Sequence, residues 1–231
     1  MITVHHLENS RSLRVLWLLE ELGLRYTVKR YARHPKTLLA PPELKQVHPL
    51  GKSPVITDHT GSGDITVAES GAIVEYLIDA HAQAQGLGSL RPAAGSPEQR
   101  RYTYWLHFAE GSLMPPLLLS LVFSKVREAP VPFFIKPVVR AIADKVTAQF
   151  IRPNVDNLLA FMNSELAHAP WFAGDAFTAA DIQLSYPLQA AHARRALDGR
   201  HPRLLDWLKR IEARPAYQRA LVAGGPYQPV P

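Results

Sequence analysis

The chain has 231 residues, of which 47% are hydrophobic and 20% charged, and this composition excludes a disordered protein. It contains no cysteine, which excludes disulfides, thiolate metal sites and a redox thiol carried by the protein itself. The formal net charge is +6, and because residues 1–83 hold nine basic and nine acidic side chains, the whole excess lies beyond them.

The ends and the apolar runs predict no targeting or membrane segment. The first residues lack the basic and apolar regions of a signal peptide. Apolar runs such as Leu117–Phe123 are far shorter than the roughly 20 residues of a membrane helix. The densest basic stretch, Arg194–Arg214, has no interleaved aromatic pattern, so we interpret it as a solvated helical face. We expect a cytoplasmic protein with neither nucleic acid nor membrane as a partner.

Short strands and helices alternate over residues 1–83. A strand at Ile2–His6 precedes a helix that opens near Ser10 and ends at Gly23, with an apolar stripe of leucines and Trp17. Further along the chain we expect a strand at Tyr26–Tyr31, a short helix after Pro41-Pro42-Glu43, a hairpin of Val55–Thr57 with Ile65–Val67, and a helix from Glu69 to Ala82. These elements form an α/β unit.

The remainder of the chain is helical in pattern. Residues 84–97 are rich in Gly, Pro and Ser and are interpreted as a linker. Residues 98–231 form an all-α second domain, with helices expected at 97–124, 136–165, 179–195 and 202–213. The apolar, proline-broken segment Pro130–Pro137 is either a packed loop or a lid over an apolar pocket.

The first motif, Lys52-Ser53-Pro54-Val55, places a proline directly before a strand. Proline lacks an N–H and therefore suits a turn or the start of a strand. If the Ser53–Pro54 bond is cis, the Ser53 backbone can pair with an extended peptide ligand as an added strand does, and otherwise the motif is a plain turn. Lys52 in the same cleft would suit a carboxylate.

The second motif, Glu69-Ser70, lies where the last strand meets the helix that follows it. Ser70 either caps that helix or holds a ligand carboxylate together with the first backbone N–H groups. Glu69 beside it suits an ammonium group. A carboxylate and an ammonium side by side describe the amino-acid end of a small peptide.

The motifs together resemble those of the cytosolic glutathione transferases. The match covers nearly the whole chain: Pro49-Leu-Gly-Lys52-Ser53-Pro54, Glu69-Ser70-Gly-Ala-Ile73, and Trp171 to Ile182 with a capping box of Thr178 and Asp181. The opening Asn9-Ser-Arg-Ser-Leu resembles a bacterial and fungal branch of the family. The resemblance implies a thioredoxin-like α/β domain joined to an all-α domain. It also implies a glutathione site of Lys52, Ser53, Pro54, Val55, Glu69 and Ser70.

This resemblance requires glutathione's thiol to ionise near neutral pH, although a free thiol has a pKa near 8.5. In related classes the hydrogen-bond donor lies between the first strand and the first helix, and is Tyr, Ser or Cys. By position Ser10 is the first catalytic candidate, Asn9 the second and Ser12 the third. Ser10 as a plain helix cap is the alternative. Where some serine-type relatives have a histidine for the glycine end of glutathione, this sequence has Leu39.

A second substrate would contact the helical domain. The predicted pocket residues are Tyr104, Trp105, Phe108, Glu110 and Ser112, although aromatic residues at helical spacing are usually core. His5 and His6 are neighbours on a strand, so they point to opposite faces and do not form a metal site.

The predicted function is a glutathione transferase that conjugates the thiolate to hydrophobic electrophiles or reduces peroxides with it. No cofactor beyond glutathione is expected, and the resemblance implies a homodimer. The alternatives are a glutathione-dependent disulfide reductase, dehalogenase or isomerase, or a non-catalytic binding module on the same fold.

Overall fold

The computed structural model describes residues 1–82 and 90–228. Its first part contains a four-stranded sheet, ordered β2-β1-β3-β4, built from β1 Ile2–Leu7, β2 Tyr26–Tyr31, β3 Val55–Thr60 and β4 Gly63–Ala68. Strand β1 is parallel to β2 and antiparallel to β3, so Val4 lies between Val28 and Ile56. The four predicted strands are confirmed.

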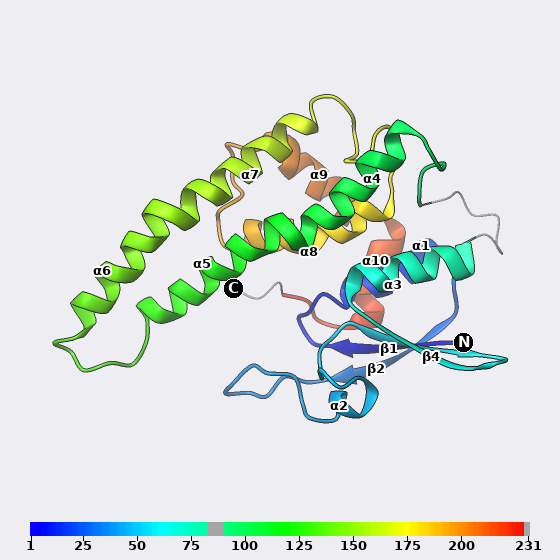
Figure 1. Cartoon of the computed structure of the whole chain (residues 1–231), viewed down its shortest axis with the longest axis horizontal. Helices are drawn as coiled ribbons and strands as arrows, with labels where there is room; N and C mark the ends of the chain where they lie inside the picture. Colours follow the sequence, from blue (N-terminus) through cyan, green and yellow to red (C-terminus); the bar gives the residue numbers. More distant parts are fainter. Residues whose placement is uncertain (83–89, 229–231) are drawn as a thin grey trace.

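Helices α1 (Leu13–Glu21), α2 (Leu44–Val47) and α3 (Ser70–Leu77) belong to the same part of the chain. Helix α3 continues as a π-helical turn, Ile78–Ala82. Helix α1 is buried from Leu13 to Leu19 because it lies between the sheet and the helical part of the molecule (Figure 1). The predicted order of strands and helices is confirmed, and so is the thioredoxin-like α/β class.

The elements that the structure describes after Ser96 are helices, as predicted. The helices are α4 Pro97–Phe108, η3 Ala109–Leu113, α5 Met114–Arg127, α6 Lys136–Val146, η4 Thr147–Ile151, α7 Arg152–Glu165, α8 Ala179–Ala193, α9 Pro202–Glu212 and α10 Pro215–Gly224. The segments η3 and η4 are π-helical turns that join their neighbours into long continuous helices.

Helix α10 was not predicted. It starts with Pro215 at its first position, packs beside α1, and is attached there by Arg214, which donates to both carboxylate oxygens of Glu21 at 2.6 and 2.8 Å. A proline directly after Arg214 was the available signal for a new helix start.

The two parts share one hydrophobic core. Trp17 of α1 contacts the ring of Tyr217 of α10 edge to face at 5.1 Å, and Trp105 of α4 packs on Phe172 at 4.7 Å. The predicted capping box of Thr178 and Asp181 is present at the start of α8. The buried Asp181 also accepts hydrogen bonds from the Phe172 N–H at 3.2 Å and the Trp207 indole at 3.0 Å, so it connects three segments of the core.

One helical run in the described part of the chain, Pro97–Arg127, is long and apolar enough by length and composition alone to cross a membrane. Core helices of globular proteins meet the same criteria. Here the first half of the run is such a core helix, since Trp105, Ala109 and Leu113 are buried.

The linker prediction falls partly outside the described residues, which omit 83–89. Residues 90–96 have no helix or strand, and α4 begins at Pro97 with the Ser96 hydroxyl accepting from the Gln99 N–H at 3.0 Å. The division into domains at residues 83 and 98 stays a prediction. Segment Pro130–Pro137 is exposed at the end of the α5–α6 hairpin, so it is not a packed loop.

Candidate functional site

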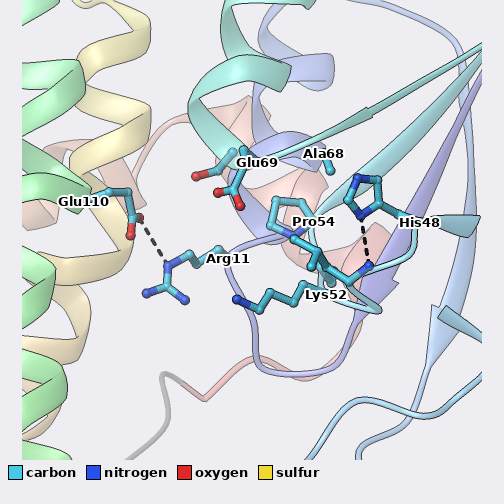
Figure 2. A pocket seen from close by; sticks show the side chains of 10 residues that line it. Arg11, His48, Lys52, Pro54, Ala68, Glu69 and Glu110 are labelled. Carbon is cyan, nitrogen blue, oxygen red and sulfur yellow. Dashed lines mark hydrogen bonds and ion pairs between the residues drawn. The ribbon is translucent and has the colours of Figure 1, made fainter. Parts of the chain in front are cut away.

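A cavity of about 230 Å³ opens where the sheet part meets the helical part. Figure 2 shows Glu69 from the start of α3, Arg11 from the segment before α1, Lys52 from the loop before β3, and Glu110 from η3 around it. The full lining is Arg11, His48, Leu50, Lys52, Ser53, Pro54, Ala68, Glu69, Ser70 and Glu110. The structure thus brings the two sequence motifs together in one cavity.

The Ser53–Pro54 peptide bond is cis. The Ser53 side chain faces the sheet, where its hydroxyl donates to the His5 carbonyl at 3.0 Å and accepts from the Leu7 N–H at 3.3 Å. Among the described residues the Ser53 backbone N–H and C=O have no hydrogen-bond partner. An edge of free backbone therefore borders the cavity, as the extended-peptide hypothesis requires.

Glu69 has a backbone conformation that residues other than glycine rarely adopt, with φ at 72° and ψ at 123°. Such a conformation costs about 1 to 3 kcal/mol and is concentrated at functional sites. It turns the chain from β4 into α3, and in Figure 2 the Glu69 carboxylate lies in the cavity. No ion pair neutralises this carboxylate in the described part of the chain.

The hydroxyl of Ser70 is held from inside the protein. It is 4% exposed, and its oxygen accepts from Arg14 Nη1 at 3.2 Å and from Gln183 Nε2 at 3.0 Å. A serine oxygen has two acceptor positions and one proton. Because both acceptor positions are used, the proton is left to donate, and a carboxylate in the cavity is a suitable acceptor.

Two arginines hold Glu110. Arg14 Nη1 lies 2.6 Å and Arg11 Nε 3.2 Å from its Oε1, and both guanidiniums also stack over the ring of Tyr186. Burial favours the neutral carboxyl, but the two positive charges outweigh it and lower the pKa of Glu110. Burial lowers the pKa of Arg14, and the Glu110 charge opposes that effect. Glu110 is therefore an anion already neutralised by the protein.

The charges left for a ligand are those of Lys52 and Glu69, together with one positive charge of the Arg11 and Arg14 pair, because a single Glu110 carboxylate balances only one of them. Lys52 is exposed, lines the cavity, and has no ion pair within the part of the chain that the structure describes. His48 accepts from the Leu50 N–H at 3.4 Å and shapes the loop that carries Lys52. The site offers the cations Lys52 and Arg11, the Glu69 carboxylate and the Ser70 hydroxyl as a donor.

The three predicted catalytic candidates lie in the turn between β1 and α1. Ser10 is 4% exposed and Ser12 is fully buried, and neither Ser10, Ser12 nor Asn9 lines the cavity wall. Ser10 Oγ and Ser12 Oγ are 2.7 Å apart, and Ser12 Oγ lies 2.8 Å from Nδ1 of His6. The hydroxyls therefore form a chain that leads from the turn into the core.

The direction of this chain follows from His6. Burial and the nearby Arg30 charge lower the pKa of His6 to about 4, so the ring is neutral, and it donates its one proton to the Gly224 backbone. The Ser12 proton is then donated to Nδ1 of His6 at 2.8 Å or to the Leu7 carbonyl at 3.3 Å. Ser12 has no second proton, so Ser10 donates to Ser12, and the Ser10 proton points away from the cavity.

Asn9 differs from both serines. It is half-buried, has φ at 49° in the left-handed region that Asn tolerates, and its Oδ1 accepts from the Gln228 N–H at 2.8 Å. Arg33 donates to its carbonyl at 3.2 Å. The protons of its side-chain amide have no partner among the described residues, so they remain available as donors.

The residues predicted for a second substrate do not all lie at the cavity. Trp105 and Phe108 are 1% and 6% exposed and pack with Phe161 and other rings in the helical core. Tyr104 is half exposed beside them. Ser112 is exposed and absent from the cavity wall. Of this set, Glu110 lines the cavity.

Two contributors were missed or left open by sequence reasoning. Gln183 lies on α8, 113 residues from Ser70, and no local pattern marks it beyond its place in the first turns after the capping box. From the sequence Arg14 can be either a source of positive potential or a structural ion-pair partner, and in the structure it is 1% exposed and paired with Glu110. Across the residues that the structure covers, no cluster of three potential metal ligands occurs.

The fold and the site together define a two-part protein in which a thioredoxin-like sheet carries a charged cavity facing a helical bundle. Residues 10–80 match the family model of the glutathione S-transferase N-terminal domain, and residues 136–210 match that of the C-terminal domain. Glutathione S-transferase 1 of Saccharomyces cerevisiae is 36% identical over 94% of this chain and 92% of its own length. The chain therefore belongs to the glutathione S-transferase family.

Solved structures agree with this assignment. A glutathione S-transferase from Actinobacillus pleuropneumoniae is 33% identical, covers 96% of this chain and 92% of its own, and superposes with a TM-score of 0.77. A family member from Pseudomonas fluorescens with two glutathione molecules bound is 26% identical, covers 95% and 92%, and has a TM-score of 0.72.

Proposed function

We propose that this enzyme binds glutathione in the cavity between Lys52 and Glu69 and transfers its sulfur to hydrophobic electrophiles. The family assignment supports a transferase, and the charges of the cavity support the ligand. Glu69 suits the ammonium of the γ-glutamyl group, the Ser70 hydroxyl suits its carboxylate, and Lys52 suits the glycine carboxylate. The cis Ser53–Pro54 segment offers free backbone to the cysteinyl part between them.

The observation that carries this proposal is the state of the Ser70 hydroxyl. Two buried donors occupy its oxygen, so the hydroxyl acts as a donor toward the cavity. A buried donor without an acceptor costs about 1 to 3 kcal/mol, and a ligand carboxylate removes that cost.

In the proposed reaction the bound thiol loses its proton to solvent and the sulfur forms a bond to an electrophilic carbon as the leaving group departs. The protein's contribution is to hold glutathione and to stabilise the thiolate by a hydrogen bond. We infer that Asn9 is that donor, because Ser10 gives its proton to Ser12 whereas the Asn9 amide protons are unused. With a peroxide, two glutathiones would be oxidised to the disulfide and the peroxide reduced to water and alcohol.

Titration calorimetry with glutathione tests the ligand, and thiolate absorbance of the complex tests its activation. Glu69→Gln should raise the Kd about tenfold, since it removes the charge facing the ammonium. Glu43→Gln, an exposed glutamate outside the cavity, is the matched control and should leave the Kd unchanged. Absence of glutathione binding by the unaltered protein would support the non-catalytic module instead. Binding without thiol ionisation would contradict the transferase mechanism.

A glutathione-dependent disulfide reductase is the second candidate. A disulfide-bond oxidoreductase of Escherichia coli is 28% identical over 78% of this chain, and reduction of one disulfide to two thiols would consume two glutathiones and release glutathione disulfide. The protein has no cysteine, so both electrons would have to come from glutathione. Parallel assays with a small disulfide and with an aromatic halide separate the two activities.

The homodimer and the cytoplasmic location are also proposals. The family resemblance supports a homodimer, and the absence of cysteine fits a reducing compartment. Sedimentation velocity of the full chain measures the first, and cell fractionation the second.

A further inference from the structure

The hairpin of α5 and α6 projects from the body of the molecule. Its distal end, residues 125–140, is called the hairpin tip here and lies at one extremity of the longest axis in Figure 1. The buried residues of α5 are confined to its first turn, Met114, Pro116 and Leu117, and Ala143 is the buried residue of α6. Beyond Leu117 the two helices therefore pack mainly on each other, with an ion pair of Arg127 and Asp144 at 2.7 Å.

The hairpin tip exposes two adjacent aromatic side chains. Phe133 is 86% and Phe134 66% exposed, with their rings edge to face at 5.6 Å. Ile135 and Val138 continue the exposed apolar surface onto α6. Single exposed apolar residues are ordinary, but four within six positions at an extremity indicate a surface that another body covers.

The hairpin tip does not serve as a lid over the cavity. Glu110 marks the cavity wall on η3, and the 14 residues of α5 span about 20 Å between η3 and the turn that leads to Phe133. The tip is thus separated from the proposed glutathione site by the length of a helix.

The positive charge of the hairpin tip indicates which kind of partner covers it. Residues 125–140 contain four basic side chains, Lys125, Arg127, Lys136 and Arg140, and one acidic side chain, Glu128, which gives a net charge of +3. In the described part of the chain Lys125, Lys136 and Arg140 have no ion pair. A second copy docked tip to tip would bring two such charges together, whereas an anionic surface would neutralise them.

We propose that the hairpin tip docks on anionic lipid bilayers, with Phe133 and Phe134 in the interfacial layer and the basic side chains at the headgroups. Aromatic rings flanked by lysine and arginine are suited to this boundary, where apolar contact and electrostatic attraction act together. The contact is peripheral and needs no membrane-spanning helix. It revises the expectation that the protein has no membrane partner. It would also place the enzyme where hydrophobic electrophiles accumulate.

Flotation of the full chain with vesicles of phosphatidylcholine, with and without phosphatidylglycerol, tests the proposal. We expect partitioning into the anionic vesicles that falls with added salt and is weak for phosphatidylcholine alone. The double variant Phe133→Ser, Phe134→Ser should partition at least about tenfold less. Phe150→Ser, at an exposed phenylalanine of η4, is the matched control and should partition as the unaltered protein does.

A second pair of variants separates local from total charge. Lys136→Gln with Arg140→Gln should weaken partitioning about fivefold for each charge removed. Arg203→Gln with Lys209→Gln, on the exposed side of α9, removes the same net charge and should have little effect. Equal losses in both pairs, equal binding to neutral vesicles, or unchanged binding of the phenylalanine variant would each overturn the proposal. So would a lower sedimentation mass for that variant, which would identify the tip as a self-association surface.

Discussion

Arg14 donates to the Ser70 hydroxyl at 3.2 Å from a position that is 1% exposed, although the two residues are 56 positions apart in the chain. A buried guanidinium is costly unless it is paired, and the pairing here with Glu110 is also at the edge of the cavity. The same side chain therefore stabilises the junction of the two parts of the molecule and polarises the proposed ligand-binding hydroxyl.

Replacing Arg14 should affect both stability and ligand affinity. Arg14→Met is expected to lower the free energy of unfolding by about 2 kcal/mol. This is less than the loss expected when one partner of a fully buried ion pair is removed, because Glu110 remains paired with Arg11. The Kd for glutathione should rise about tenfold as Ser70 loses one of its two donors. Urea denaturation and calorimetry measure the two effects. Arg11→Met is the control for stability alone, because Arg11 lines the cavity and its one-third exposed ion pair should contribute under about 1 kcal/mol. Equal losses of stability for both variants would refute the special role of Arg14.

Gln183 should act on glutathione through Ser70. Gln183→Met removes the second donor, so the hydroxyl can turn its proton elsewhere, and we expect the Kd to rise about fivefold. Ser70→Ala should raise it about tenfold. In the Ser70→Ala background the Gln183 substitution should then have no further effect on binding. Additive losses in this double-mutant cycle would show that Gln183 acts independently of the hydroxyl.

The thiol donor can be identified by the pKa of bound glutathione, read from thiolate absorbance against pH. Asn9→Ala should raise that pKa by about 1 pH unit, since an unused amide donor near the site is lost. Ser10→Ala should change it less, because the Ser10 proton is already donated to Ser12 at 2.7 Å. A larger effect of Ser10→Ala would restore the serine mechanism that the sequence favours.

Local signals in the sequence were sufficient for much of the fold and for the position of the site. Pro54 and the Glu69-Ser70 pair stand at junctions of strands with loops and helices, and such junctions are recognisable from a few adjacent residues. The capping box of Thr178 and Asp181 was predictable for the same reason, since its two residues are close in the chain. Helix α10 was missed because it has only 10 residues and its packing on α1 is a contact between distant segments.

Interactions between distant residues could not be predicted in this way. The Ser70 hydroxyl depends on Arg14 and Gln183 from two other helices, and no periodicity encodes which proton a hydroxyl donates. The helical spacing of Trp105 and Phe108 fits a pocket wall and a core equally well. They belong to the core because their rings pack against α7 and Phe172, and the sequence does not reveal that packing.

His6 should make stability depend on pH between its ordinary pKa of 6.5 and its value in the folded protein of about 4. Burial lowers this pKa, so in that interval the unfolded chain binds a proton that the folded protein does not. The contribution of His6 to the free energy of unfolding is therefore fully present above pH 6.5. It decreases as pH falls toward 4, by at most about 3 kcal/mol. The buried His5, whose pKa burial also lowers, adds a loss of the same sign.

The variant His6→Asn isolates this contribution, because its amide oxygen can accept from Ser12 without titrating. Its unfolding free energy, measured by urea denaturation, should fall less steeply from neutral to acidic pH than that of the unaltered protein. His168→Asn, at an exposed histidine without a side-chain hydrogen bond in the described part of the chain, is the control and should leave the slope unchanged. Parallel pH profiles for His6→Asn and the unaltered protein would mean that folding leaves the pKa of His6 unchanged. Below pH 6.5 the charged ring would then donate from Nδ1 to Ser12, and Ser10 would again have a proton for the thiolate.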